Sequence, residues 1–132
     1  MNTNDSMIVK NIKWLLLIPG VITCSMIYAA IDPQGALMQT FGESISGPVA
    51  EIVVRNWGLL ITMVGALMIY AAYRPQYRNL VIAIAVFGKL VFVALNLIYG
   101  QAYLAKSGIA VIFDSVLIVI YLLYFLQSRK TA

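Results

Sequence analysis

Four apolar blocks, each close to the length that crosses a bilayer, dominate the sequence. They cover residues 14–31, 57–73, 80–99 and 109–126. A hydrocarbon core of about 30 Å takes roughly 20 residues of helix at 1.5 Å per residue. Of the 132 residues, 62% are hydrophobic and only 11% are charged, whereas about 25% are charged in an ordinary soluble domain. The sequence therefore predicts an all-α integral membrane four-helix bundle, one domain over residues 1–132, with spans at about residues 12–31, 49–74, 79–100 and 107–127.

The positions of lysine and arginine predict which side of the membrane each connection faces. Six flank the termini and the second connection, namely Lys10, Lys13, Arg74, Arg78, Arg129 and Lys130. The opposite side has Arg55 and Lys106. Because positive residues in short loops stay in the cytoplasm, both termini are predicted to be cytoplasmic (N-in/C-in). The same asymmetry accounts for the net charge of +4, so we do not expect nucleic acid as a partner.

The connection between the first and second spans is the longest, at residues 32–50, and is predicted to lie on the outer side of the membrane. Residues 36–41 form a short amphipathic segment that either lies on the membrane surface or caps the bundle. The sequence Ser46-Gly47-Pro48 predicts the start of the second helix, since proline is favoured in the first turn. Ser107-Gly108 is likewise interpreted as the start of the fourth helix.

Two ionisable residues interrupt the apolar blocks. Lys89 is in the middle of the third span and Asp114 is two turns into the fourth. A charge at the bilayer centre costs at least about 2.5–3.5 kcal/mol, so such residues are functional candidates by default. The third and fourth spans are adjacent and antiparallel, which places Lys89 about 15 Å and Asp114 about 10 Å below the outer edge. We predict that they form a buried ion pair, which either serves a ligand or only fixes helix register.

Other polar side chains fall near the pair and predict a pocket that opens outward. In this hypothesis Arg55 and Lys89 meet the polar or anionic head of a ligand, Asp114 and Asn96 orient those cations, and aromatic residues line the apolar part. The predicted ligand-binding residues are Arg55, Lys89, Asp114, Asn96, Glu51, Phe92 and Tyr28. Structural alternatives remain open, because Glu51 and Arg55 are spaced for a surface pair and Gly58 and Gly65 for helix packing.

Standard catalytic groups are missing from the sequence. It has no histidine, which excludes histidine-ligated haem, histidine acid–base chemistry and most zinc sites. It also has no phosphate-binding glycine loop and no cluster of carboxylates for a metal. Catalysis is therefore disfavoured, and no cofactor is predicted apart from a bound quinone or lipid.

The chain resembles the DoxX-like superfamily of small four-helix bacterial membrane proteins, and within it the BphX-like and related families. The resemblance depends on Arg55-x-x-Gly58 followed by Gly65, a basic residue in the third helix (Lys89) and an acid in the fourth (Asp114). It implies a multi-pass protein of the bacterial inner membrane. Some relatives are linked to quinone reduction or thiol redox chemistry. The single cysteine of this chain argues against a thiol role.

Three functions are consistent with these features. The leading hypothesis is a non-catalytic protein that binds a small amphiphilic or aromatic ligand, such as a quinone or lipid. The second is an accessory or assembly subunit of a membrane redox complex, and the third is a small proton-coupled transporter that uses Asp114 as its relay. Expected partners are the lipid bilayer and either further copies of the chain or a larger membrane complex.

Overall fold

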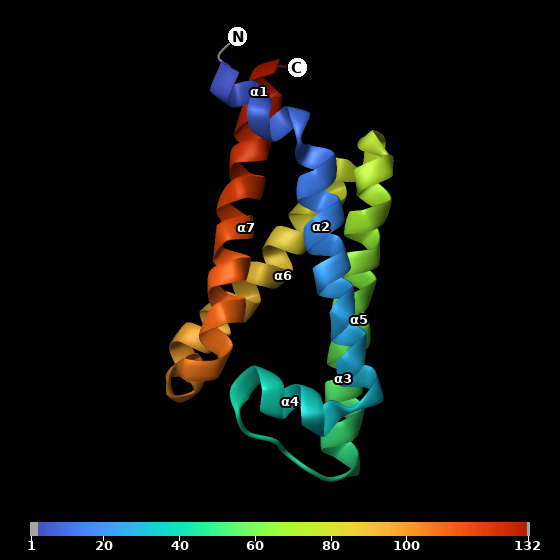
Figure 1. Ribbon diagram of the computed structural model, residues 1–132, viewed down its shortest axis with the longest axis vertical. Coiled ribbons are helices and arrows are strands. Elements are labelled where there is room, and N and C mark those ends of the chain that lie inside the picture. The colour runs from blue at the N-terminus through green and yellow to red at the C-terminus, as the bar shows by residue number, and fades with distance from the viewer. Residues whose placement is uncertain (1–2, 132) are drawn as a thin grey trace.

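The computed structural model describes residues 3–131 and the side chains of residues 7–128. Helices account for nearly all of this part of the chain, which contains no strand (Figure 1). In chain order they are α1 (Thr3–Lys10), α2 (Ile12–Cys24), the 3-10 turn η1 (Ser25–Ile27), α3 (Tyr28–Ile31), α4 (Pro33–Phe41), α5 (Pro48–Tyr73), η2 (Pro75–Tyr77), α6 (Arg78–Tyr99), η3 (Gln101–Tyr103) and α7 (Leu104–Thr131).

Four helical stretches are long and apolar enough to cross a membrane. Within the described residues they are Ile12–Ile31, Pro48–Tyr73, Pro75–Tyr99 and Gln101–Ser128. The predicted all-α class with four spanning helices is thus confirmed. Helix α1 and the end of α7 lie together at one end of the molecule, here called the terminal end (Figure 1). The opposite end is called the distal end. The side chains of Arg129 and Lys130, used to predict the orientation, lie outside the described residues.

Helices α2 and α5 pack closely along a seam of small residues. A Cβ atom added at Gly65 would lie 2.8 Å from the backbone nitrogen of Cys24 and 2.8 Å from the carbonyl oxygen of Gly20. One added at Gly58 would lie 2.7 Å from the Cβ of Ala29. Glycine is needed at these points because the α5 backbone touches that of α2 at Gly65 and those of η1 and α3 at Gly58. The helix-packing interpretation of Gly58 and Gly65 is therefore confirmed.

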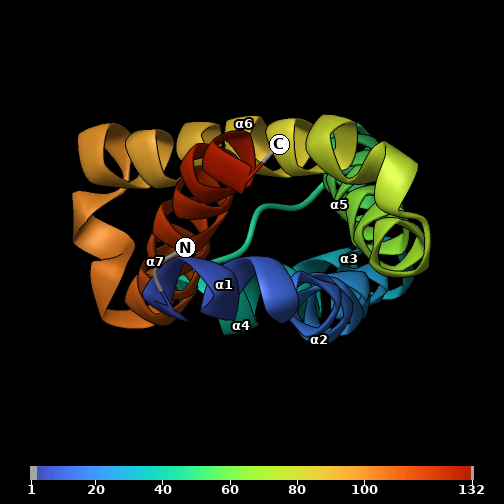
Figure 2. The same cartoon turned by 90° about the horizontal axis from the view of Figure 1, so that it is seen from above.

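The main core lies in the terminal half of the bundle and joins all four spanning helices. Its fully buried members include Leu16 of α2, Met68 of α5, Ile82 of α6 and Tyr121 of α7. The Tyr121 hydroxyl donates a hydrogen bond to the Leu15 carbonyl oxygen at 2.8 Å. Toward the distal end α6 runs obliquely along one side of the molecule, from α5 to α7 (Figures 1 and 2).

Helix α4 lies across the distal end, where the spanning helices have separated (Figure 1). It contacts α3, α5 and α7, and its Ala36 is buried in a small cluster with Ala29 and Val54. Residues 36–41 therefore cap the bundle, which is one of the two alternatives that the sequence left open. Helix α5 begins as predicted, with Gly47 as its N-cap and Pro48 in its first turn.

Two features of the chain differ from the sequence interpretation. Helix α7 begins at Leu104, so the prediction that it starts at Ser107-Gly108 was wrong. Ser107 is fully buried and its hydroxyl donates to the Tyr103 carbonyl oxygen at 3.2 Å. Because a serine hydroxyl can bond to the preceding turn in this way, it is tolerated within a helix. Helix α1 was not predicted, because it is short and too polar to form a span.

Candidate functional site

Lys89 and Asp114 form the predicted ion pair. The Lys89 ammonium donates to Asp114 Oδ1 at 2.8 Å, and the two side chains are 9% and 17% exposed. It is the only ion pair among the side chains that the structure describes. The Lys89 Nζ also lies 5.5 Å from the centre of the Phe113 ring, a cation–π distance. The contact neutralises both charges within the apolar part of the bundle.

The helical repeat explains why the two side chains meet. On α6, Ala85, Lys89 and Asn96 are all buried, because residues three or four positions apart share one helix face. Leu117 and Tyr121 are buried on the same face of α7 as Asp114. The polar residues predicted to share these faces therefore point into the bundle.

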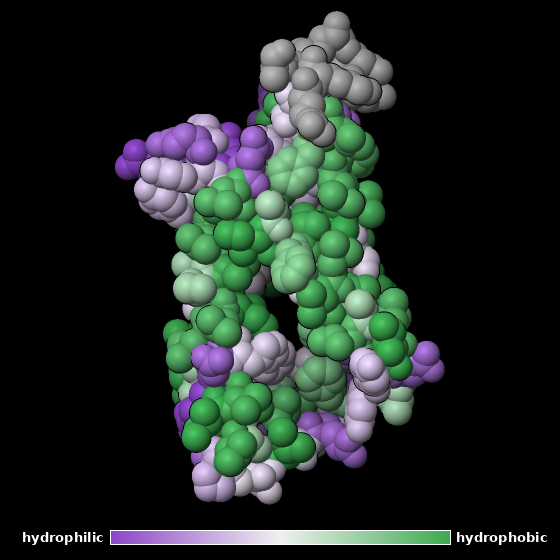
Figure 3. Space-filling view, turned by 180° about the vertical axis from the view of Figure 1, so that it is seen from behind, coloured by the Kyte–Doolittle hydropathy of each residue, from purple (hydrophilic) through white to green (hydrophobic). Residues whose placement is uncertain are grey.

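A cavity of about 490 Å³, here called the central cavity, opens beside the ion pair. Lys89 and Asp114 form part of its wall, and most of its other lining residues are apolar. All four spanning stretches and α4 contribute, the residues being Ile22, Thr23, Ser25, Met26, Thr40, Trp57, Leu60, Ile61, Val64, Ala85, Gly88, Lys89, Val91, Phe92, Leu95, Ala110, Phe113 and Asp114. Figure 3 shows the molecule hollowed between its apolar helices. Gly88, an exposed member of this lining, has open space beside it, because a Cβ there would meet nothing within 4 Å.

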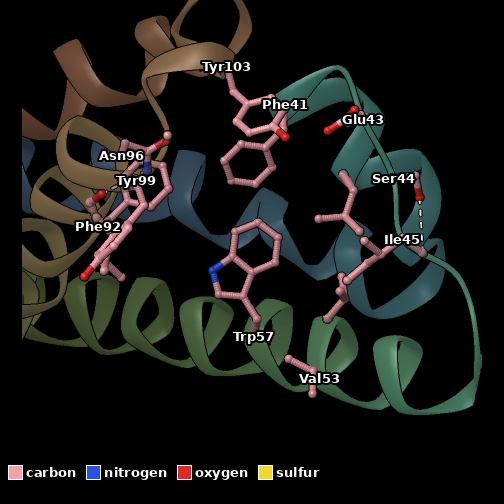
Figure 4. Close-up of a pocket in the computed structure, with 14 residues that line it drawn as sticks. Phe41, Glu43, Ser44, Ile45, Val53, Trp57, Phe92, Asn96, Tyr99 and Tyr103 are labelled. Atoms are coloured by element: carbon pink, nitrogen blue, oxygen red, sulfur yellow. Dashed lines mark hydrogen bonds between the residues drawn. The ribbon is translucent and has the colours of Figure 1, made fainter.

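A second cavity of about 550 Å³, here called the distal cavity, lies between α4, the connection that follows it, α5 and the end of α6 (Figure 4). Trp57, Phe92 and Leu95 line both cavities, so the two are neighbours. Five of the fourteen residues that line the distal cavity are aromatic. The Phe41 ring centre lies 6.4 Å from that of Trp57 and 6.3 Å, edge to face, from that of Tyr103.

Asn96 and Phe92 lie at these cavities, as expected. Phe92 lines both, and Asn96 lines the distal cavity. The Asn96 Nδ2 donates to the Phe92 carbonyl oxygen at 2.9 Å, whereas its buried Oδ1 has no hydrogen-bond partner. Asn96 does not contact Lys89 or Asp114 by a hydrogen bond, so it does not orient the ammonium as predicted.

Arg55, Glu51 and Tyr28 line neither cavity. The exposed Arg55 guanidinium donates to the Ala30 carbonyl oxygen, near the end of α3, where the helix dipole favours a cation. It forms no ion pair with Glu51. The Tyr28 hydroxyl donates instead to Asp32 Oδ2 at 3.2 Å. Their expected places in the pocket were therefore wrong. Local partners at the helix ends hold the side chains of Arg55 and Tyr28.

Several cavity residues were not anticipated. Trp57 lies between the two cavities, Phe113 stands over the ammonium, and Thr40 reaches the central cavity from α4. Trp57 is four residues before Ile61 and seven before Val64, which also line the central cavity. This helical spacing indicates that Trp57 shares a helix face with those cavity residues. Its position near a span end, however, is equally typical of the aromatic belt. Thr40 depends on the placement of α4, which the sequence left open.

Comparisons with family models, with curated proteins and with solved structures gave no match. The resemblance to the DoxX-like superfamily therefore stays a prediction. In the described part of the chain no group of three or more histidine, cysteine, aspartate or glutamate side chains is placed to hold a metal ion.

Proposed function

We propose that the chain is a multi-pass inner-membrane protein, with both termini in the cytoplasm, that binds an amphiphile with an uncharged polar head in its central cavity. The observation that carries this proposal is the Lys89–Asp114 pair in the cavity wall. A quinone or a lipid ester has the required chemistry. The other residues of the wall supply apolar and aromatic contacts for the rest of the molecule.

The charges of the cavity decide what kind of head it favours. Lys89 and Asp114 neutralise each other at 2.8 Å, and Arg55, the second cation of the original hypothesis, is bound at the end of α3. An anionic head would have to compete with Asp114 for the ammonium. A carbonyl or hydroxyl head needs no such exchange, because the ammonium has three donors and a carboxylate has two acceptor oxygens.

Access from the bilayer is consistent with an amphiphilic ligand. Leu60 of α5 and Val91 and Leu95 of α6 line the central cavity and are 49%, 42% and 50% exposed. We place the opening of the cavity at these side chains, where it would meet acyl chains in a membrane. A ligand dissolved in the bilayer therefore reaches the cavity between α5 and α6 without crossing water.

The experiment is mass spectrometry of small molecules that copurify with the protein. Lys89→Met is expected to lose the bound amphiphile, whereas Lys106→Met on the distal surface is expected to keep it. Because Lys89→Met also exposes Asp114 to an apolar surrounding, a second variant is needed. Gly88→Leu adds bulk to the lining of the central cavity without removing a charge, and Gly108→Leu, whose added Cβ meets nothing within 4 Å either, is its control. Equal amounts of the same molecule in both glycine variants would refute the proposal.

The two alternative functions have their own tests. For an accessory subunit of a membrane complex, gentle purification shows whether the chain elutes alone, as a homo-oligomer or with another protein. Gly58 and Gly65 are buried against α2 and α3, so they are not free to bind such a partner. For a proton-coupled transporter, Asp114→Asn is expected to abolish pH-dependent flux. The bond to Lys89 would have to break in each cycle of that mechanism.

A further inference from the structure

The distal cavity has a chemical character that the central cavity lacks. Its wall contains one charged side chain, Glu43, among the aromatic rings of Phe41, Trp57, Tyr99 and Tyr103 (Figure 4). Nothing in the binding of an uncharged amphiphile at Lys89 and Asp114 uses this carboxylate. We propose that the distal cavity is a separate binding site for an organic ammonium ion.

The rings give the first argument. The Phe41 ring lies 6.4 Å from Trp57 and 6.3 Å from Tyr103 between centroids, and Tyr99 lines the cavity from α6. The negative faces of aromatic rings attract cations, and several rings around one space are the usual means of holding an ammonium group. An aromatic cavity of about 550 Å³ has room for an ammonium with an apolar body.

The carboxylate gives the second argument. Glu43 is exposed at the edge of the cavity, next to the Tyr103 hydroxyl. No lysine or arginine described by the structure lies within 4 Å of its oxygens. The stem of Lys106 runs beside Gly42, the neighbouring residue, and its ammonium is the competing cation of this loop. Glu43 is therefore an available counter-charge for a bound ammonium.

The inner wall gives the third argument. Asn96 is 5% exposed, lines the distal cavity and has an Oδ1 without a hydrogen-bond partner. A buried acceptor without a donor is unfavourable. A ligand with N–H groups is the complement of this wall, so a protonated amine fits it better than a fully alkylated ammonium.

Trp57 makes the proposal measurable. The chain has two tryptophans. Trp14 of α2 lines neither cavity, so Trp14→Phe leaves Trp57 as the only indole reporter. We expect 2-phenylethylammonium to change the Trp57 fluorescence with saturation, and the neutral 2-phenylethanol to do so only weakly. Glu43→Gln, which keeps the shape and removes the charge, should weaken the ammonium about tenfold. Glu51→Gln, an acid of the same end that lines neither cavity, should have no effect.

Further variants separate this site from the central cavity. The double variant Lys89→Met, Asp114→Leu leaves no buried charge unpaired and should leave the ammonium affinity unchanged, so failure of the amphiphile proposal does not decide this one. Phe41→Leu should weaken binding, and Lys106→Met should strengthen it. Equal binding of the alcohol and the ammonium, or an unchanged affinity in Glu43→Gln, would overturn the proposal, as would lost binding in Lys106→Met.

The ammonium group has two sources, a free amine or the headgroup of phosphatidylethanolamine. Nanodiscs of phosphatidylglycerol alone are compared with nanodiscs that also contain phosphatidylethanolamine. If the lipid is the occupant, it competes and the soluble amine binds more weakly in the second preparation. If a free amine is the occupant, its affinity is the same in both. Absence of saturable binding in nanodiscs of phosphatidylglycerol alone would refute the site.

Discussion

The Tyr121 hydroxyl donates to the carbonyl oxygen of Leu15 at 2.8 Å, across 106 residues of sequence. Leu15 precedes Pro19 by four residues, and in a regular helix its carbonyl would accept the amide of residue 19. Proline has no amide hydrogen. A tyrosine of α7 therefore supplies the donor that α2 lacks at this point. The proline, which permits a bend when α2 is considered alone, also provides the acceptor for a bond between two spanning helices.

This relationship predicts the effect of removing the hydroxyl. Tyr121→Phe should lower the free energy of unfolding by about 1–3 kcal/mol, because it leaves a buried carbonyl oxygen unsatisfied. Pro19→Ala in the same background should recover much of the loss, since the new amide can donate to Leu15. Unfolding in mixed micelles with a denaturing detergent measures both. If Pro19→Ala destabilises the Tyr121→Phe variant as much as it does the wild type, the two residues are not coupled.

The ion pair predicts strong coupling between its members. Lys89→Met and Asp114→Leu should each destabilise the protein by about 3–5 kcal/mol, because each leaves one charge alone in an apolar surrounding. The double variant should be much closer to the wild type, since no buried charge remains. A double-mutant cycle on unfolding free energies gives the coupling. Additive losses would show that the two side chains do not depend on each other.

The small-residue seam predicts an unusual sensitivity to a single methyl group. Gly65→Ala places a Cβ 2.8 Å from backbone atoms of α2, which cannot move aside cheaply. We expect a loss of about 1–3 kcal/mol from this overpacking. Gly88→Ala is the matched control, because its Cβ meets nothing within 4 Å and alanine favours a helix over glycine. Similar stability of the two variants would mean that α2 and α5 are not in close contact.

Replacement of Asn96 is expected to keep or raise the stability of the protein. Its Oδ1 is buried without a partner, and the Phe92 carbonyl that its Nδ2 contacts is also the helix acceptor for the residue 96 amide. Asn96→Leu is therefore expected to be at least as stable as the wild type in thermal unfolding without ligand. A clear loss of stability would show that the Asn96 amide has a partner in the folded protein that the structure does not contain.

The spans and the ion pair were predictable from sequence for physical reasons. Apolar length reports the thickness of a bilayer directly, and the cost of an isolated charge in hydrocarbon requires Lys89 to find a partner such as Asp114. The same argument does not apply to Arg55, because its predicted position is near the membrane edge. There the carbonyl oxygen of Ala30 is a sufficient partner for the guanidinium. A pocket beside the ion pair was predicted, but the presence of two cavities and most of their lining residues were out of reach. They depend on how far α6 diverges from α5 and on where α4 is placed, and neither has a local pattern.

The neutrality of the Lys89–Asp114 pair has an electrical consequence. Moving one elementary charge across a membrane potential of 100 mV changes its energy by about 2.3 kcal/mol. In this bundle an ammonium and a carboxylate 2.8 Å apart experience nearly the same potential, so the two forces cancel. An uncharged molecule seated beside them would enter and leave with equal ease in energised and de-energised cells. Neutralising either side chain alone would give the site a net charge on which the potential can act.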